Sequence, residues 1–183
     1  NTVSNFGQDG TGTGSTMYGI QTTTGTIVCD SNVVNYLTVI KTSGTGALYG
    51  IYNIASPPNE NYNYNQVYNL THNGTGTTYG IYTFTATGVR TVSNNLVHSI
   101  TAAGTTVAGI NQASSSPTIF KNKIYNVQST SPGAPTVSGL ILGSLGTSGV
   151  ANVYNNLIGD IKAPNASTSA PTSPTVRGIN ITT

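Results

Sequence analysis

Short apolar runs alternate with polar clusters along this chain. A run such as residues 80–84 (GIYTF) alternates with a period of two, which is typical of a β-strand. Clusters of Gly, Asn, Ser and Pro separate the runs, as expected for turns. Val, Ile, Thr and Tyr are abundant, whereas the charged helix formers are scarce. The pattern therefore predicts an all-β chain.

A six-residue motif recurs from one end of the chain to the other. It begins with Asn and places apolar residues two and five positions later, as in residues 95–100 (NLVHSI). Its copies begin 31, 33, 30, 27 and 34 residues apart, at Asn1, Asn32, Asn65, Asn95, Asn122 and Asn156. A second marker, Gly followed by Ile or Leu, recurs at Gly19, Gly50, Gly80, Gly109, Gly139 and Gly178. Two markers that share a period of about 30 residues indicate a solenoid or an array.

A parallel β-helix (β-solenoid) fits both markers best. WD-type blades are longer and carry Trp, which this chain lacks, and leucine-rich repeats need several Leu in each turn. We predict roughly five to six coils of about 30 residues in a single domain, residues 1–183, with loops at about 56–64 and 163–174. Neither end has a polar cap, so we expect both ends to be open and the chain to be a fragment of a longer one.

Each marker has an expected role in the coil. The six motif asparagines (Asn1, Asn32, Asn65, Asn95, Asn122 and Asn156) are predicted to lie at a bend, to adopt the left-handed conformation and to form a side-chain ladder between coils. The apolar residues two and five positions later should point inward. The Gly of the second marker should let the backbone turn into the next strand.

The composition excludes several classes of function. Only 5% of the 183 residues are charged, against about 25% in an average protein, and we find no basic run that could bind nucleic acid. The single cysteine, Cys29, excludes an intrachain disulfide and is expected to be buried. No apolar stretch is long enough to insert into a membrane as a helix. We expect no cofactor.

The combination of the Gly-Ile marker, the Asn motif and Thr-Gly-Thr linkers resembles the repeats of large secreted Bacteroidetes proteins. That resemblance covers nearly the whole chain and implies a right-handed parallel β-helix in an extracellular or cell-surface protein. The same fold class includes pectate lyases and related polysaccharide enzymes. Their activity therefore has to be considered residue by residue.

Acidic residues offer the only candidate for catalysis. Counting from the Gly markers predicts that Asp30 and Glu60 are neighbours on adjacent coils, with Arg90 stacked next to Glu60. Two carboxylates beside a cation would suit acid–base chemistry or Ca²⁺ binding. We favour a surface salt bridge between Glu60 and Arg90, because so few acids leave no supporting shell. No catalytic residue and no metal site are therefore predicted.

The two histidines occupy different positions in the repeat, so they do not suggest a metal site. His72 follows its motif Asn by seven residues and His98 follows its own by three. His98 takes the position that Tyr68 and Tyr125 fill in neighbouring coils. A stacked aromatic row is therefore expected there.

Tyrosines recur beside the Gly marker and suggest a second use of the surface. The five are Tyr18, Tyr49, Tyr52, Tyr79 and Tyr82. Rows of their rings could bind a polysaccharide or could simply stabilise adjacent coils, and Tyr62 in the predicted loop could extend such a surface. A row of threonines that includes Thr22 and Thr83 raises ice binding, although Asn53 interrupts it.

The sequence thus favours a non-catalytic structural or adhesive segment that could form fibres. Its expected partners are further coils of the parent chain or other copies, stacked end to end or laterally. A carbohydrate-binding module that uses the tyrosine rows is the first alternative. A polysaccharide lyase or hydrolase is the second, and ice binding is the third.

Overall fold

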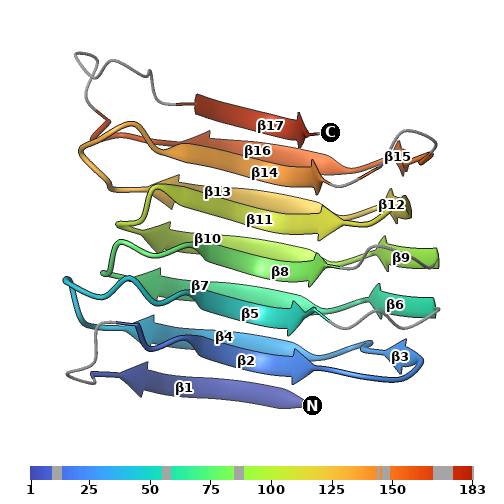
Figure 1. Cartoon of the computed structure of the whole chain (residues 1–183), viewed down its shortest axis with the longest axis horizontal. Coiled ribbons are helices and arrows are strands. Elements are labelled where there is room, and N and C mark those ends of the chain that lie inside the picture. The colour runs from blue at the N-terminus through green and yellow to red at the C-terminus, as the bar shows by residue number, and fades with distance from the viewer. Residues whose placement is uncertain are drawn as a thin grey trace.

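The chain forms a right-handed parallel β-solenoid, as predicted. This computed structural model describes residues 1–9, 14–54, 59–84, 89–143, 145, 149–166 and 175–182. Seventeen strands build three parallel sheets, and no helix that could span a membrane occurs within these ranges. In Figure 1 the chain runs leftward along one sheet at the back and rightward along another at the front while it climbs from β1 to β17, so the coil is right-handed.

Each of the first five coils contributes one strand to each sheet, and β16 and β17 add a sixth strand to sheets A and B. Sheet A stacks β1 (Thr2–Gln8), β4 (Val33–Val39), β7 (Gln66–His72), β10 (Leu96–Ala102), β13 (Lys123–Ser129) and β16 (Leu157–Lys162). Sheet B stacks β2 (Met17–Thr22), β5 (Leu48–Asn53), β8 (Thr78–Phe84), β11 (Thr106–Ala113), β14 (Thr136–Gly143) and β17 (Thr175–Ile181). Sheet C stacks β3 (Ile27–Val28), β6 (Asn59–Asn63), β9 (Val89–Ser93), β12 (Ser116–Phe120) and β15 (Asn152–Tyr154).

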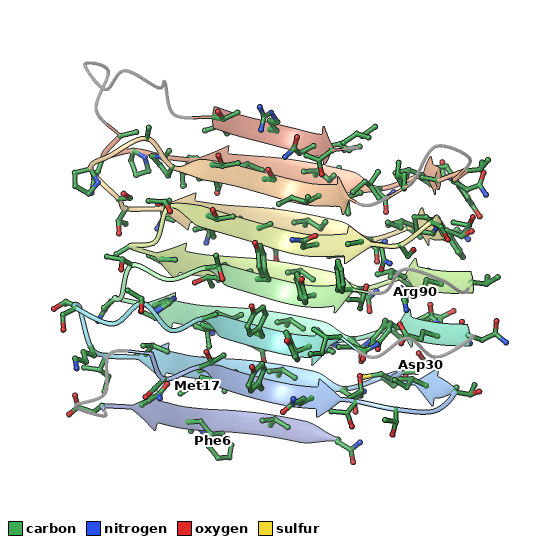
Figure 2. All side chains as sticks on the ribbon, in the orientation of Figure 1. Phe6, Met17, Asp30 and Arg90 are labelled. Atoms are coloured by element: carbon green, nitrogen blue, oxygen red, sulfur yellow. The ribbon has the colours of Figure 1, made fainter. Side chains whose placement is uncertain are left out.

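The core consists of apolar columns that run along the solenoid axis. On sheet A the first column places Val34, Val67, Val97 and Ile124 in register, and the second places Leu37, Leu70, Ile100 and Val127 in register. All eight side chains are buried, as the positions two and five after the motif Asn predict. In the first coil Phe6 is 58% exposed, because β1 is the first strand of sheet A. Figure 2 shows it on that outermost strand.

The marker glycines have a different role from the one predicted. They lie within the strands of sheet B, not at a turn, and none of the six has a positive φ. A Cβ at Gly80 would lie 2.5 Å from Val97 Cγ1 and 2.6 Å from Gly109 O. Glycine is therefore needed because sheets A and B approach each other too closely for any side chain at this position.

The predicted loop at residues 56–64 is wrong over residues 59–63, and residues 56–58 lie outside the described ranges. Residues 59–63 form strand β6, and the Tyr62 side chain is fully buried in the core. Tyr62 therefore cannot extend a surface for a ligand. In the second predicted loop, residues 163–166 form a turn in which Ala166 N donates to Ala163 O. Residues 167–174 lie outside the described ranges.

Candidate functional site

The six motif asparagines form a continuous hydrogen-bonded ladder. In each step the side-chain amide of one Asn donates to Oδ1 of the Asn one coil later. The Nδ2–Oδ1 distances are 2.9, 3.0, 3.1, 2.9 and 2.9 Å along Asn1, Asn32, Asn65, Asn95, Asn122 and Asn156. The ladder runs where the chain passes from sheet C to sheet A.

The Asn95 side chain makes all four hydrogen bonds that an amide side chain can make. Its Oδ1 accepts from both the backbone N and Nδ2 of Asn65, at 2.9 and 3.1 Å. Its Nδ2 donates to Asn122 Oδ1 at 2.9 Å and to Tyr62 O at 2.8 Å. The side chain is buried and fully satisfied, so it links three coils at once.

The left-handed residues at this bend are the neighbours of the ladder asparagines, which corrects the predicted mechanism. The residue before the ladder Asn has a φ between 55° and 59°, at Ser31, Tyr64, Asn94, Lys121 and Asn155. A second left-handed residue lies four positions after the ladder Asn, at Asn5, Tyr36, Asn69, Ser99, Asn126 and Asp160. Asn is common at both sites because it tolerates positive φ. The ladder position itself needs the amide for bonding.

The five tyrosines lie together on the outer face of sheet B, where their rings pack against one another. Tyr18 and Tyr49 stack with centroids 5.4 Å apart and planes 7° apart. Tyr52 and Tyr82 stack at 5.5 Å and 12°. Tyr18, Tyr49 and Tyr79 form one row and Tyr52 and Tyr82 form the other. The two rows are in contact, because the ring centroids of Tyr49 and Tyr52 are 4.5 Å apart, with the ring planes at 54°. Ring edges and hydroxyls, rather than free ring faces, therefore form most of this surface.

Packing within the cluster changes the acidity of the tyrosines. Burial raises the pKa of Tyr79 to about 12, despite a hydrogen bond with Asn111 that acts in the opposite direction. Burial, with smaller contributions from nearby tyrosines, raises the pKa of Tyr52 to about 12. Both phenols therefore stay neutral across the physiological range. Tyr18, at the end of its row, is 37% exposed.

The predicted aromatic row on sheet A is present. His98 lies between Tyr68 and Tyr125, with centroids 5.0 and 4.8 Å apart and planes within 7°. Lys123 Nζ lies 5.1 Å from the centroid of the Tyr125 ring. Burial and the nearby Lys123 lower the pKa of His98. His98 is therefore a member of a stacked row, and its Nδ1 also bonds Ser99 Oγ at 3.0 Å.

His72 faces the interior, away from the sheet A row. Its Nδ1 lies 2.8 Å from Thr78 Oγ1. Burial lowers its pKa, so the neutral ring is favoured. No group of three His, Cys, Asp or Glu within the described ranges could hold a metal ion.

Of the three candidate charged residues, Glu60 and Arg90 lie together and Asp30 lies apart from them. Ile27, not Asp30, pairs with Glu60, because the connection from sheet B to sheet C is two residues shorter in the first coil. Asp30 instead accepts a hydrogen bond from Asn63 N at 2.7 Å. The expected Asp30–Glu60 carboxylate pair is therefore absent.

Glu60 and Arg90 do form an ion pair, but it is not on the surface. Glu60 is 1% exposed and Arg90 is 0% exposed. Arg90 Nε donates to Glu60 Oε2, and Asn53 Nδ2 donates to Glu60 Oε1. The predicted surface salt bridge is therefore wrong, because Glu60 points into the core in register with the buried Ile27 and Arg90.

A polar network inside the solenoid was missed by the sequence reasoning. Inward side chains at the end of sheet B meet inward side chains of sheet C: Thr22 Oγ1 lies 3.1 Å from Tyr62 Oη, and Asn53 Nδ2 donates to Glu60 Oε1. Within sheet B, Thr83 donates to Gln112 Oε1 on the next coil. The signal was available, because Glu60 and Arg90 fall on the inward phase of the alternating strands at residues 59–63 and 89–93.

The described part of the threonine row is not a continuous exposed array, although Thr24 and Thr26 are exposed. Thr22, Asn53 and Thr83 are in register, but they point toward the interior, where Thr83 is 1% exposed. The other threonines of the expected row at residues 85 and 87 lie outside the described ranges. An ice-binding face cannot be built from the buried members.

Cys29 is buried, and burial raises the pKa of its thiol to about 11. The thiol is therefore a packed core group rather than a reactive one.

No protein family, curated protein or solved structure matches the chain, so its likeness to secreted Bacteroidetes repeats stays a prediction from its motif.

Proposed function

We propose that this chain is a non-catalytic structural segment, a rigid spacer within an extracellular or cell-surface protein. The observation that carries the proposal is the continuity of bonding along the axis. Each coil is joined to the next by parallel strand pairing and by one rung of the asparagine ladder. A stack of this kind holds its ends at a fixed separation and orientation.

The state of the reactive side chains supports the same role. The Glu60 carboxylate is bonded within the core, and His98 is stacked between two rings. A general acid or base must reach its substrate within hydrogen-bond distance. These groups instead stabilise contacts between coils.

Carbohydrate binding through the tyrosines is the main rival. Sugars stack on the exposed faces of aromatic rings, whereas here most ring faces contact a neighbouring ring. The Tyr18 ring, at the end of its row, is the exposed ring that remains for recognition. The spacer therefore has the stronger support.

Affinity electrophoresis through polysaccharide gels, with parallel assays for released reducing ends and unsaturated sugars, separates the two. The spacer proposal expects no retardation and no product over a broad glycan panel. Retardation that is lost in Tyr49→Ala/Tyr79→Ala but kept in Tyr154→Ala, on a distant sheet, would replace it with a binding module. Released product would replace it with an enzyme.

Two further measurements address location and assembly. An antibody against the chain should label intact producing cells, and labelling that requires permeabilised cells would contradict a surface role. Electron microscopy of the native protein should show rods with a spacing near 4.8 Å along the axis. Compact particles without that repeat would contradict the spacer.

A further inference from the structure

The interior of the solenoid carries an ion pair that joins two particular coils. Glu60 on β6 and Arg90 on β9 are directly in register and point into the core. Arg90 Nη1 and Nη2 have no hydrogen-bond partner within the part of the chain that the structure describes. The guanidinium therefore relies on Glu60 to offset its burial. Figure 2 labels Arg90 beside β9.

The column that contains this pair distinguishes the coils from one another. Along sheet C its members are Ile27, Glu60, Arg90 and Pro117. If β6 paired with β12 in place of β9, Glu60 would lie opposite Pro117. If β3 paired with β9, Arg90 would lie opposite Ile27. Either slip by one coil buries a charge without its partner, which is strongly unfavourable.

The asparagine ladder and the inward columns of sheet A do not distinguish one coil from the next. Every coil presents the same ladder Asn, so a slipped coil would still find a rung. The first inward column of sheet A contains only Val or Ile, and the second contains only Leu, Ile or Val. The hydrogen bonds between parallel backbones do not depend on the side chains. A chain of near-copies therefore needs some contact that occurs only once.

We propose that the Glu60–Arg90 pair specifies the register in which the second and third coils stack. Its contribution is to selectivity among alternative pairings rather than to the stability of the correct one. This matches the known use of single buried polar groups to fix register in repetitive assemblies. The inference concerns folding and does not depend on the role proposed for the solenoid.

Disulfide trapping after refolding reads the register directly. Asn61, Thr91 and Thr118 occupy one column beside the ion pair, on consecutive strands. In a Cys29→Ser background, Asn61→Cys/Thr91→Cys reports the native register, because paired strands lie about 4.8 Å apart. Asn61→Cys/Thr118→Cys reports a slip, because its sites lie about 9.6 Å apart in the native fold, too far for a disulfide.

Both cysteine pairs are first tested with Glu60 and Arg90 intact, by refolding from denaturant and oxidation. Asn61→Cys/Thr91→Cys should then form its disulfide, and Asn61→Cys/Thr118→Cys should form none. Replacing the pair with apolar residues of similar size, Glu60→Leu/Arg90→Met, should leave the strand content measured by circular dichroism unchanged. The native register should then no longer be the only one that forms. The slip bridge should then appear, identified by peptide mapping. The neutral control Thr83→Val/Gln112→Leu removes a buried polar contact in the same region and should form no slip bridge.

Three results would overturn the proposal. One is a folded Glu60→Leu/Arg90→Met variant that forms only the native bridge. Another is an unfolded variant, which would make the pair a requirement for stability rather than for register. The third is a slip bridge of equal yield in the Thr83→Val/Gln112→Leu control, which would show that any loss of buried polarity permits slipping.

Discussion

A single buried asparagine links three coils in this molecule, which makes the ladder its most sensitive position. Asn95→Ala removes two donors and one shared acceptor. Asn65 N and Tyr62 O lose their bonds to the Asn95 side chain, and Asn65 Nδ2 keeps only its bond to Cys29 O. We expect the free energy of unfolding to fall by about 2–4 kcal/mol, since each buried unsatisfied group costs about 1–3 kcal/mol.

Urea denaturation followed by circular dichroism measures this loss. Asn73→Ala is the matched control, because Asn73 is exposed and makes one long side-chain bond, to Ile40 O at 3.3 Å. Its effect should stay within about 0.5 kcal/mol. Equal losses at the two sites would contradict the special role of the ladder.

The stability of the fold should fall in mild acid because of His72. Burial lowers its pKa below the usual value of about 6.5. The unfolded chain then binds the proton more readily than the folded chain does. Stability is therefore complete above about pH 6.5 and declines as the pH drops below it, by at most about 1.4 kcal/mol per pH unit for one group.

The measurement compares urea midpoints at about pH 7.5 and about pH 5.5, above the range in which carboxylates usually titrate. His72→Gln should reduce the difference between the midpoints. His98 also has a lowered pKa, so the comparison is made in a His98→Tyr background, which extends the ring row with the residue of its neighbours. A difference unchanged by His72→Gln would rule out His72 as its source.

At the scale of the strands, close packing between sheets A and B depends on the glycine column. Gly80→Ala would place a Cβ 2.5 Å from Val97 Cγ1, so one of the two strands must shift. We expect destabilisation of about 1–3 kcal/mol or more, as for other overpacked cores. Gly159→Ala is the control, since no atom lies within 4 Å of its added Cβ and its φ is not positive. Thermal melting of the two variants should separate them clearly, and equal melting temperatures would contradict this account.

Strand type and register were predictable because the signals repeat. The motif Asn and the inward apolar positions recur in every coil, so spacing alone aligned the strands of sheet A. The turns from sheet B to sheet C vary in length, and counting from Gly19 therefore placed Asp30 where Ile27 lies. The role of Gly80 also could not be read from the sequence, because it follows from the distance between two sheets rather than from local conformation.

The environment of single side chains was less predictable than the fold. Alternation identifies the strand at residues 59–63 only after its inward phase is assigned, and the acidic Glu60 argued for the wrong phase. Likewise, the spacing of the tyrosines placed them in rows but gave no information on ring orientation. Whether a ring face meets solvent or another ring depends on side-chain packing, which a repeat pattern does not contain.

At the scale of the whole molecule, a solenoid should tolerate the loss of one complete coil. Deleting residues 95–121 removes the fourth coil and lets Asn65 bond Asn122, while the Glu60–Arg90 pair is kept. We expect a shorter chain that still folds, because each coil contacts mainly its neighbours. Circular dichroism should show the same strand signature.

Deleting residues 95–108 is the matched control. This loss of about half a coil removes strand β10 of sheet A and the start of β11. A sheet C strand would then lead directly into sheet B, which breaks the order of the three sheets. The shorter deletion should therefore unfold the chain although it removes fewer residues. Equal behaviour of the two deletions would contradict the coil as the structural unit.

The most direct test of the account is hydrogen exchange of asparagine side-chain amides, followed by nuclear magnetic resonance. The central claim is that the buried amides of Asn32, Asn65, Asn95 and Asn122 bond each coil to the next. We predict that these amides exchange as slowly as the core backbone amides, while that of the exposed Asn73 exchanges rapidly. Ladder amides that exchange as fast as that of Asn73 would contradict the claim.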